Sequence, residues 1–449
     1  MKKRITLLLF IILPGYFAIP QMADFVVKTD SLLNYLYSEN LFSGRILFEK
    51  NGNVIYCGEF DRFTKGTKKT KIGSVTKVFT ALIIYQLIDE EKLELSQPIG
   101  KYFPEIKYSS DITIEQLLSH TSGIYNITDW NDYYATRRKT FTREEIIDLV
   151  TSHKPEFKPG KDCSYSNTNY ILLGFIIEEV TGKSYALNIK ERIADKSGLN
   201  DTYFPAAGAD QSWNGNSYQF NGEVWTQDVD SDPSLPFSAG ALISSNEDLA
   251  TMMYDLFNHR IISDTSLKTM KTMINGKIGH GLLKAPFYEH KGWGHTGRID
   301  EYRAFAGYFP DDSLILTITS NGMTVNLNDV LTGVLSTYFG RDYTFPPKYD
   351  YNMEIPATDV FTGNYKAKLA GFITVARFQI TNAGRNHLFM NENFDNPYGE
   401  KVLLERKGAY VFHSREARGD LLFSTNKKGE VKGIIFQQGK MKIHCKKVS

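Results

Sequence analysis

The run from Val75 to Ile88 is apolar on nearly every face that a helix would present, and Gly73 marks the turn that leads into it. A surface helix keeps one polar face, so this pattern predicts a helix in the middle of a domain. The polar residues of the stretch gather at its N-terminal end, where unpaired backbone N–H groups and the helix dipole favour negative charge. Ser74 and Lys77 stand there, and residues three apart lie on one face of a helix.

The remaining pattern predicts a mixture of helices and antiparallel strands. Residues 44–59 alternate around an Asn51-Gly52 turn, which predicts a hairpin ahead of the interior helix. Helical periodicity predicts three further helices, at residues 113–118, 141–152 and 168–181. Aromatic and β-branched residues predict two strands joined by a tight turn, at residues 299–309 and 314–319.

Ser74 and Lys77 are a candidate nucleophile and its base. A serine hydroxyl becomes nucleophilic when a neighbouring base takes its proton. A lysine withdrawn from water loses part of its preference for the charged form, and so it can join a proton relay. Many helices contain Ser-x-x-Lys by chance, so the assignment depends on the rest of the chain.

Two further polar motifs follow. Tyr165-Ser166-Asn167 lies in residues 158–169, a loop rich in Pro, Gly, Ser and Asn. A tyrosine near a lysine can serve as general base and an asparagine amide can bind a substrate carbonyl; the alternative is an ordinary turn with a packed tyrosine. Residues 292–297 match the dinucleotide-binding pattern Gly-x-Gly-x-x-Gly, but that pattern must open a helix and strand-like residues follow here. We therefore expect residues 295–298 to form the leading edge of a hairpin.

The composition is that of a soluble globular protein with more than one domain: 449 residues, 42% hydrophobic and 23% charged. Its 52 basic and 51 acidic residues give no electrostatic footprint for nucleic acid, so no nucleic-acid partner is predicted. The nine histidines and three cysteines show no metal-ligand spacing, and we predict neither a metal site nor a cofactor.

The N-terminus has the pattern of an export signal. Lys2, Lys3 and Arg4 precede an apolar run at residues 5–13, which is too short to span a bilayer. We predict that residues 1–23 are removed on export to the periplasm or the extracellular space. Because the cleavage site is poorly defined, the alternative is an uncleaved segment that anchors the protein at the membrane.

The motifs Ser-Val-Thr-Lys (74–77), Tyr-Ser-Asn (165–167) and His-Thr-Gly (295–297), in this order and at these separations, resemble those of the serine β-lactamase and penicillin-binding-protein superfamily. The likeness covers about residues 41–339 and points to the class C-like branch. It implies an α/β (α+β) fold, in which helices flank an antiparallel sheet and a helical subdomain packs against it, with the site in the cleft between. The branch contains D-alanyl-D-alanine carboxypeptidases, D-aminopeptidases, carboxylesterases and class C β-lactamases, and likeness of fold does not choose among them.

The resemblance also implies a role for each motif residue. Ser74 is the expected acylated nucleophile, Lys77 its proton partner and Tyr165 the general base, although whether Lys77 or Tyr165 is the true base stays open. The backbone N–H groups of Ser74 and Arg298 are the expected oxyanion hole. The expected substrate-binding residues are Asn167, His295, Thr296, Gly297 and Arg298.

Two residues depart from the family pattern. His295 stands where a lysine is common, which weakens the case for a fixed cation that binds a substrate carboxylate. Arg298 stands where a small residue is usual. In a regular strand Arg298 shares a face with Thr296, so both would face the cleft, where Arg298 could bind a carboxylate. In a bulged strand Arg298 would instead turn outward, to Asp300 or Glu301.

The chain is expected to divide into two domains after the signal. Residues 24–345 would hold every motif and so react without the rest, and Pro346-Pro347 opens a linker at residues 346–352. Residues 353–449 contain short strands separated by turns, which predicts a small antiparallel barrel or sandwich, similar to the lipocalin-like domains of some members of the branch. Its role stays open between a packing appendage and a lid or ligand-binding module.

Together these patterns predict an exported serine hydrolase that forms an acyl-enzyme on Ser74. The bond it cleaves would be an amide or ester, as in a D-amino-acid peptide, a carboxylic ester or a β-lactam. The expected partner is a small molecule or a peptidoglycan-derived peptide or ester. The alternative is a penicillin-recognising or cell-wall-binding protein that keeps the fold without turnover.

Overall fold

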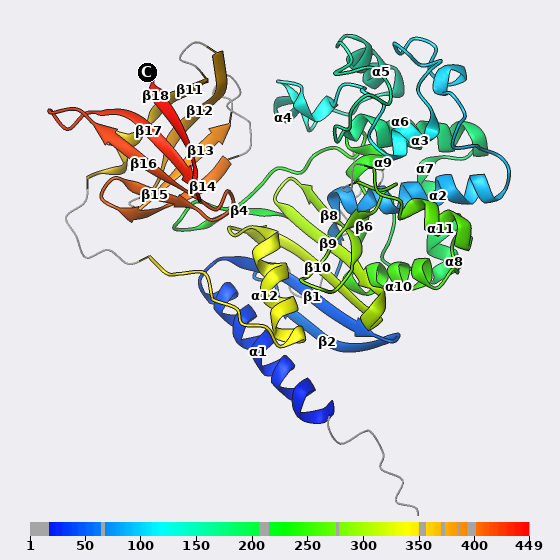
Figure 1. The fold of residues 1–449 in the computed structure, drawn as a ribbon, viewed down its shortest axis with the longest axis horizontal. Coiled ribbons are helices and arrows are strands. Elements are labelled where there is room, and N and C mark those ends of the chain that lie inside the picture. Colours follow the sequence, from blue (N-terminus) through cyan, green and yellow to red (C-terminus); the bar gives the residue numbers. More distant parts are fainter. Residues whose placement is uncertain are drawn as a thin grey trace, which may run out of the picture.

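The structure, a computed structural model, describes residues 18–63, 68–205, 215–274, 278–349, 356–369, 373–384, 386–392 and 401–448. Figure 1 shows a sheet with helices on both faces, a largely helical region beside it, and a barrel formed by the C-terminal strands. Of the predicted signal, residues 1–17 lie outside the described part of the chain, as do residues 350–352 of the predicted linker.

The central sheet has six strands in the order β2-β1-β10-β9-β8-β7, all paired antiparallel. β1 and β2 form the predicted hairpin, with Lys50 opposite Asn53. Asn51 and Gly52 between them both have positive φ, as a two-residue turn of this kind requires. The strands are β1 (Phe42–Lys50), β2 (Asn53–Phe60), β7 (Leu283–Lys284), β8 (Trp293–Ile299), β9 (Tyr302–Phe309) and β10 (Leu314–Met323).

Both faces of the sheet are buried. Leu47 and Ile315 belong to the core shared with the large helical region, which includes α10 (Asn246–Phe257). Their neighbours Ile46 and Leu316 belong to a second core, beneath α1 (Ala18–Ser38) and α12 (Leu327–Phe339). Successive residues of a strand point to opposite faces, so each strand contributes to both cores. Figure 1 shows α1 and α12 together on one face and α10 on the other.

The helical region packs around α2 (Thr76–Asp89), whose residues from Thr76 to Leu87 are all buried, so the predicted interior helix is confirmed. Two short strand pairs lie outside the central sheet: β3 (Thr70–Lys71) with β6 (Ile243–Ser244), and β4 (Tyr218–Phe220) with β5 (Trp225–Gln227). Within the described residues no helix is both long and apolar enough to cross a membrane. The remaining helices are α3 (Ile114–Leu118), α4 (Tyr133–Thr136), α5 (Arg143–Thr151), α6 (Asn167–Thr181), α7 (Tyr185–Ile189), α8 (Asp195–Ser197), α9 (Phe237–Gly240) and α11 (Asp264–Met270).

The C-terminal strands close into an antiparallel barrel that runs from β11 to β18 in sequence order, with β18 paired back to β11. The predicted barrel is therefore confirmed. Its core contains five aromatic side chains, those of Phe361, Tyr365, Phe378, Phe412 and Phe423. The strands are β11 (Gly363–Leu369), β12 (Ile373–Gly384), β13 (His387–Glu392), β14 (Lys401–Gly408), β15 (Val411–Ser414), β16 (Gly419–Thr425), β17 (Val431–Gln438) and β18 (Met441–Lys447).

One predicted strand is wrong in its bounds. The pattern predicts a single strand over residues 299–309, but the chain turns at Asp300 and Glu301, and β9 begins at Tyr302. Residues 293–299 form β8, so residues 295–298 lie in the first strand of the β8–β9 hairpin. Asp300 makes the turn with φ of 49°, a conformation that aspartate tolerates better than most residues.

Asn246, the first residue of α10, joins this helix to the sheet. Its side-chain amide donates to the Thr317 carbonyl oxygen at 3.0 Å, and its side-chain oxygen accepts from the Thr319 hydroxyl at 2.5 Å. Asn246→Ala should lower the free energy of unfolding by about 1–3 kcal/mol, because the sheet partners stay buried without this bond. Denaturant unfolding followed by tryptophan fluorescence measures the change.

The matched control is Asn258→Ala, at the other end of the same helix, where the asparagine side chain makes only an exposed bond to the Tyr254 carbonyl. This control should change the free energy of unfolding by no more than about 0.5 kcal/mol. Equal losses in the two variants would show that Asn246 does not join the helix to the sheet.

Candidate active site

Ser74 lies on the short 3₁₀ turn η1 (Gly73–Val75), which runs directly into α2. From Thr70 to Leu87 it is the only residue that is not buried. Gly73 adopts φ of 50°, a conformation that favours glycine, and the turn it makes places Ser74 at the edge of the core. The Ser74 side chain therefore lines the cleft while the surrounding stretch fills the interior.

Lys77 lies one turn further along and is fully buried. Its Nζ lies 3.0 Å from Ser74 Oγ, 2.7 Å from Asn167 Oδ1 and 2.8 Å from the carbonyl oxygen of Ala239 in α9. Burial lowers the pKa of Lys77 well below its usual value of 10.5. The neutral amine is therefore accessible beside Ser74 at pH values where an exposed lysine is charged.

Tyr165 approaches Ser74 from the loop before α6. Its hydroxyl contacts the Ser74 side chain, and its ring centre lies 5.0 Å from Lys77 Nζ. Burial raises the pKa of Tyr165 above its usual 10.0, and the bond to Ser74 offsets only part of this change. The buried His120 ring stacks on Tyr165 at 4.4 Å between ring centres and accepts a hydrogen bond from Ser166 N at 3.0 Å, so it positions the motif.

Asn167 begins α6 and lines the cleft. Its Oδ1 accepts from Lys77, while its Nδ2 donates to Thr128 Oγ1 at 3.1 Å. Its backbone N–H donates to Asn126 Oδ1 at 2.9 Å. Only the oxygen of an amide accepts, so the bond from Nδ2 to Thr128 fixes the orientation that presents Oδ1 to Lys77.

The opposite wall of the cleft is β8, whose backbone touches η1. A Cβ on Gly297 would lie 1.9 Å from the Ile72 carbonyl oxygen and 3.1 Å from Ser74 N, and one on Gly73 would lie 2.6 Å from Arg298 N. Glycine at both positions permits this approach. The close approach of β8 and η1 brings the backbone N–H groups of Ser74 and Arg298 near each other. An oxyanion hole needs two such donors side by side.

His295 is buried on β8, with its ring centre 6.3 Å from that of Tyr165, and Thr296 beside it is half-buried. Burial, with a smaller contribution from Lys77, lowers the pKa of His295 to about 3. The ring is therefore neutral at physiological pH and offers no cation to a substrate carboxylate.

Arg298 lines the cleft beside Ser74, as a regular strand predicts. β8 and β9 pair without irregularity, with Arg298 opposite Arg303, so the alternative of a bulged strand is wrong. The guanidinium Nη1 lies 2.7 Å from Oε1 of Glu416, which belongs to the barrel. No sequence pattern points to this partner, because Glu416 lies far beyond every motif.

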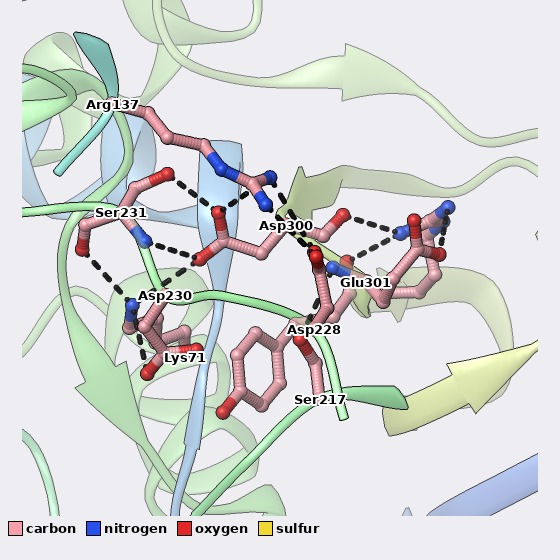
Figure 2. A network of polar contacts seen from close by, with 10 residues as sticks. Lys71, Arg137, Ser217, Asp228, Asp230, Ser231, Asp300 and Glu301 are labelled. Carbon is pink, nitrogen blue, oxygen red and sulfur yellow. Dashed lines mark hydrogen bonds and ion pairs between the residues drawn. The ribbon is translucent and has the colours of Figure 1, made fainter. Parts of the chain in front are cut away.

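A network of charges around Asp300 holds the tip of the β8–β9 hairpin (Figure 2). The Asp300 carboxylate accepts from Ser231 N at 3.0 Å and lies 3.3 Å from Lys71 Nζ and 3.6 Å from Arg137 Nη1. Arg137 also pairs with Asp228 at 2.8 Å. Each cation in this network faces a carboxylate, so the network fixes the end of the cleft rather than offering a charge to a substrate.

These elements border an open cleft of about 180 Å³. Apolar surface from Tyr133, Tyr134, Leu235 and Pro236 lies across from the polar motif residues. Among the described residues that line this cleft, Arg298 is the only cationic one and Asp300 the only acidic one. The described part of the chain contains no cluster of His, Cys, Asp or Glu arranged to hold a metal ion.

Three contributors to the site were missed by sequence reasoning: Asn126, the carbonyl of Ala239, and Glu416. A backbone carbonyl has no residue signature, so Ala239 had no signal to find. Asn126 and Glu416 meet their partners only because distant segments of the chain pack beside them. For Asn126, the one sequence feature that could have pointed to the site is its position a few residues after the turn at residues 120–123.

The serine, the buried lysine and the tyrosine, at the junction of an antiparallel sheet and a helical region, define a protein of the active-site-serine, penicillin-recognising class. Residues 50–334 match the family model Beta-lactamase, and the chain belongs to this family. The predicted resemblance and the predicted fold class are thereby confirmed.

Individual relatives agree with a serine hydrolase. Teichoic acid D-alanine hydrolase of Staphylococcus aureus is 33% identical over 184 residues, which cover 39% of this chain and 44% of that protein. The chain thus spans less than half the length of this relative. A D-stereospecific amidohydrolase from Streptomyces sp. matches with 26% identity and a TM-score of 0.61, over 70% of this chain and 98% of its own.

A penicillin-binding protein homologue from Pyrococcus abyssi, described as octameric, matches nearly the whole chain. The match covers 95% of this chain and 100% of that one, with a TM-score of 0.60. At 22% identity it shows the fold alone. A first domain of this fold followed by a C-terminal domain is therefore also found in another protein.

Gly297→Ala should disable the site without removing any motif side chain. The added Cβ would overlap the Ile72 carbonyl, so β8 must move away from η1 and carry the Arg298 N–H with it. We expect the rate of Ser74 acylation to fall by about a hundredfold or more. The matched control is Gly408→Ala in the barrel, where the nearest atom would lie at 3.5 Å. Equal rates in the two variants would mean that this contact does not set the geometry.

Proposed function

We propose that the protein is an exported serine hydrolase that forms an acyl-enzyme on Ser74 and hydrolyses an amide or ester of a D-amino acid. The observation that carries the proposal is a fully buried lysine amine 3.0 Å from an accessible serine hydroxyl. The substrate class is supported by two similar proteins, one named a teichoic acid D-alanine hydrolase and the other a D-stereospecific amidohydrolase.

The arrangement supports a two-step reaction. Lys77, as the neutral amine, takes the Ser74 proton while Oγ bonds to the substrate carbonyl carbon, and the N–H groups of Ser74 and Arg298 bind the oxyanion. The proton then passes through the Tyr165 hydroxyl to the leaving amine or alcohol as its bond to carbon breaks. Water then attacks the resulting ester and gives a proton to Lys77, and as the acid is released Lys77 passes that proton to Ser74 Oγ.

Burial changes the two candidate bases in opposite directions. It lowers the pKa of Lys77, which makes the basic form more accessible, and it raises the pKa of Tyr165, which makes the phenolate less accessible. Both changes favour Lys77 as the proton acceptor and leave Tyr165 as a neutral relay. Asn167, bonded to the same amine, orients Lys77 toward Ser74.

Export rests on the basic and apolar pattern of the first residues. Phe25 on α1 is buried and packs against Phe48 and Tyr338 at 5.2 and 5.3 Å between ring centres. Removal of residues 1–23 would leave these contacts in the mature chain. The mass of the protein recovered outside the cytoplasm tests the predicted cleavage.

The first test is covalent labelling. A fluorescent fluorophosphonate should label the protein once, at Ser74, as measured by intact mass and peptide mapping. Ser74→Ala should abolish the label and keep the melting temperature, because the change removes only a hydroxyl from a half-buried residue. A label that persists in Ser74→Ala would exclude Ser74 as the nucleophile. Labelling by penicillin without turnover of any D-aminoacyl amide or ester would favour the non-catalytic alternative.

The second test is the pH dependence of acylation. Because burial lowers the pKa of Lys77, the rate should rise with pH and level off at a lower pH than the ordinary pKa of a lysine would give. A phenolate base at Tyr165 would instead make the rate rise beyond about pH 10, because burial raises that pKa.

Two variants separate the roles. Lys77→Arg keeps a cation but cannot release a proton, so acylation should fall by about a hundredfold or more at every pH. Tyr165→Phe should slow turnover while the pH at which the rate levels off stays the same. If Tyr165→Phe instead changed the pH at which the rate levels off, and Lys77→Arg kept the rate of the parent, Tyr165 would be the base.

A further inference from the structure

The barrel reaches the cleft through the loop between β15 and β16, residues 415–418. Glu416 Oε1 lies 2.7 Å from Arg298 Nη1, and the two side chains are 32% and 29% exposed. Arg298 lines the cleft together with Ser74, and its N–H belongs to the proposed oxyanion hole. A residue from the last part of the chain therefore pairs with a residue that lines the cleft.

The loop is held in place by contacts that do not involve Arg298. The backbone oxygen of Glu416 accepts from Asn326 Nδ2 at 2.9 Å, and Arg418 Nη2 lies 2.7 Å from Asp329 Oδ1. Asn326 is also the residue that caps α12. Since the loop is held through the Glu416 backbone and through Arg418, loss of the Glu416 charge should leave the loop bound to Asn326 and Asp329.

A second contact fixes the barrel at the same edge of the cleft. Gly222, just after β4, approaches His387 of β13 so closely that a Cβ would lie 2.2 Å from the imidazole ring. Ser217, just before β4, accepts a hydrogen bond from Glu301 N at the β8–β9 turn, at 3.3 Å. The segment around β4 thus joins the barrel to the hairpin that carries Arg298.

We propose that Glu416 is a specificity-determining residue, through which the barrel neutralises Arg298 and so selects acyl donors that carry no carboxylate. This inference rests on the proposed function, since it concerns the substrate of Ser74. His295 is neutral, so among the described residues that line the cleft Arg298 is the cation that a substrate carboxylate would meet. Glu416 already occupies that cation, and a second carboxylate would face a like charge. Donors with an uncharged group or an ammonium meet no such repulsion.

The experiment compares two compounds that differ only in charge: the p-nitroanilides of N-succinyl-D-alanine and of its carboxamide, N-succinamoyl-D-alanine. For each compound we measure the concentration that halves the rate of Ser74 labelling by the fluorophosphonate, a readout that does not require turnover. The parent protein should bind the carboxamide more tightly than the carboxylate. In Glu416→Gln the preference for the carboxylate should rise by about tenfold or more, because the positive charge of Arg298 is then no longer offset by Glu416.

Three further variants identify the cause. Arg298→Ala and the double variant Arg298→Ala with Glu416→Gln should both lack the gain, because Glu416 acts through Arg298. Arg418→Ala removes a different ion pair of the loop, the one with Asp329, and should keep the selectivity of the parent. A gain that persists without Arg298, a gain of the same size in Arg418→Ala, or no gain in Glu416→Gln would overturn the inference. Failure of the parent to label at Ser74 would instead overturn the proposed function.

Discussion

The site depends on one buried amine. Lys77 lies in the interior, and its Nζ bonds to Ser74 from its own turn, to Asn167 at the start of α6 and to the Ala239 carbonyl in α9. A buried polar group without partners costs free energy, so these segments must meet around α2. The same burial lowers the pKa of the amine and makes it a base. Packing of the helical region and reactivity of the serine therefore have a common cause.

The second half of the site depends on a contact between backbones. η1 belongs to the helical region and β8 to the sheet, and Gly73 and Gly297 let them touch. This contact brings the N–H of Ser74 and of Arg298 together, so an oxyanion would be bound from both structural units at once. Asp300 at the end of β8 is fixed separately, by Lys71 and by Ser231 from the neighbouring loop. The strand that forms one wall of the cleft is thus held at its middle and at its end.

The motifs place the cleft between the sheet and the helical region. The barrel is a third structural unit that reaches it. Its loop at residues 415–418 brings a carboxylate to Arg298, and the barrel is also attached through Asn326 and through the segment around β4. The neutral His295 matters for the same reason, because it leaves Arg298 as the cation among the described residues that line the cleft. The proposed selectivity for substrate charge then depends on how the C-terminal domain docks, while the proposed catalytic groups all come from the first domain.

The sequence alone was enough for the interior helix, the β1–β2 hairpin, the barrel and the family, because each depends on local periodicity, turn residues or motif spacing. It placed Ser74 and Lys77 on one face for the same reason, since helix geometry fixes residues three apart. It missed the turn at Asp300, whose conformation is supported by contacts from Lys71 and Ser231, far away in the chain. The partner of Arg298 and the shifted pKa values were decided only by the tertiary structure. A strand pattern says which face a side chain takes, whereas its charge partner and its loss of water depend on what folds against that face.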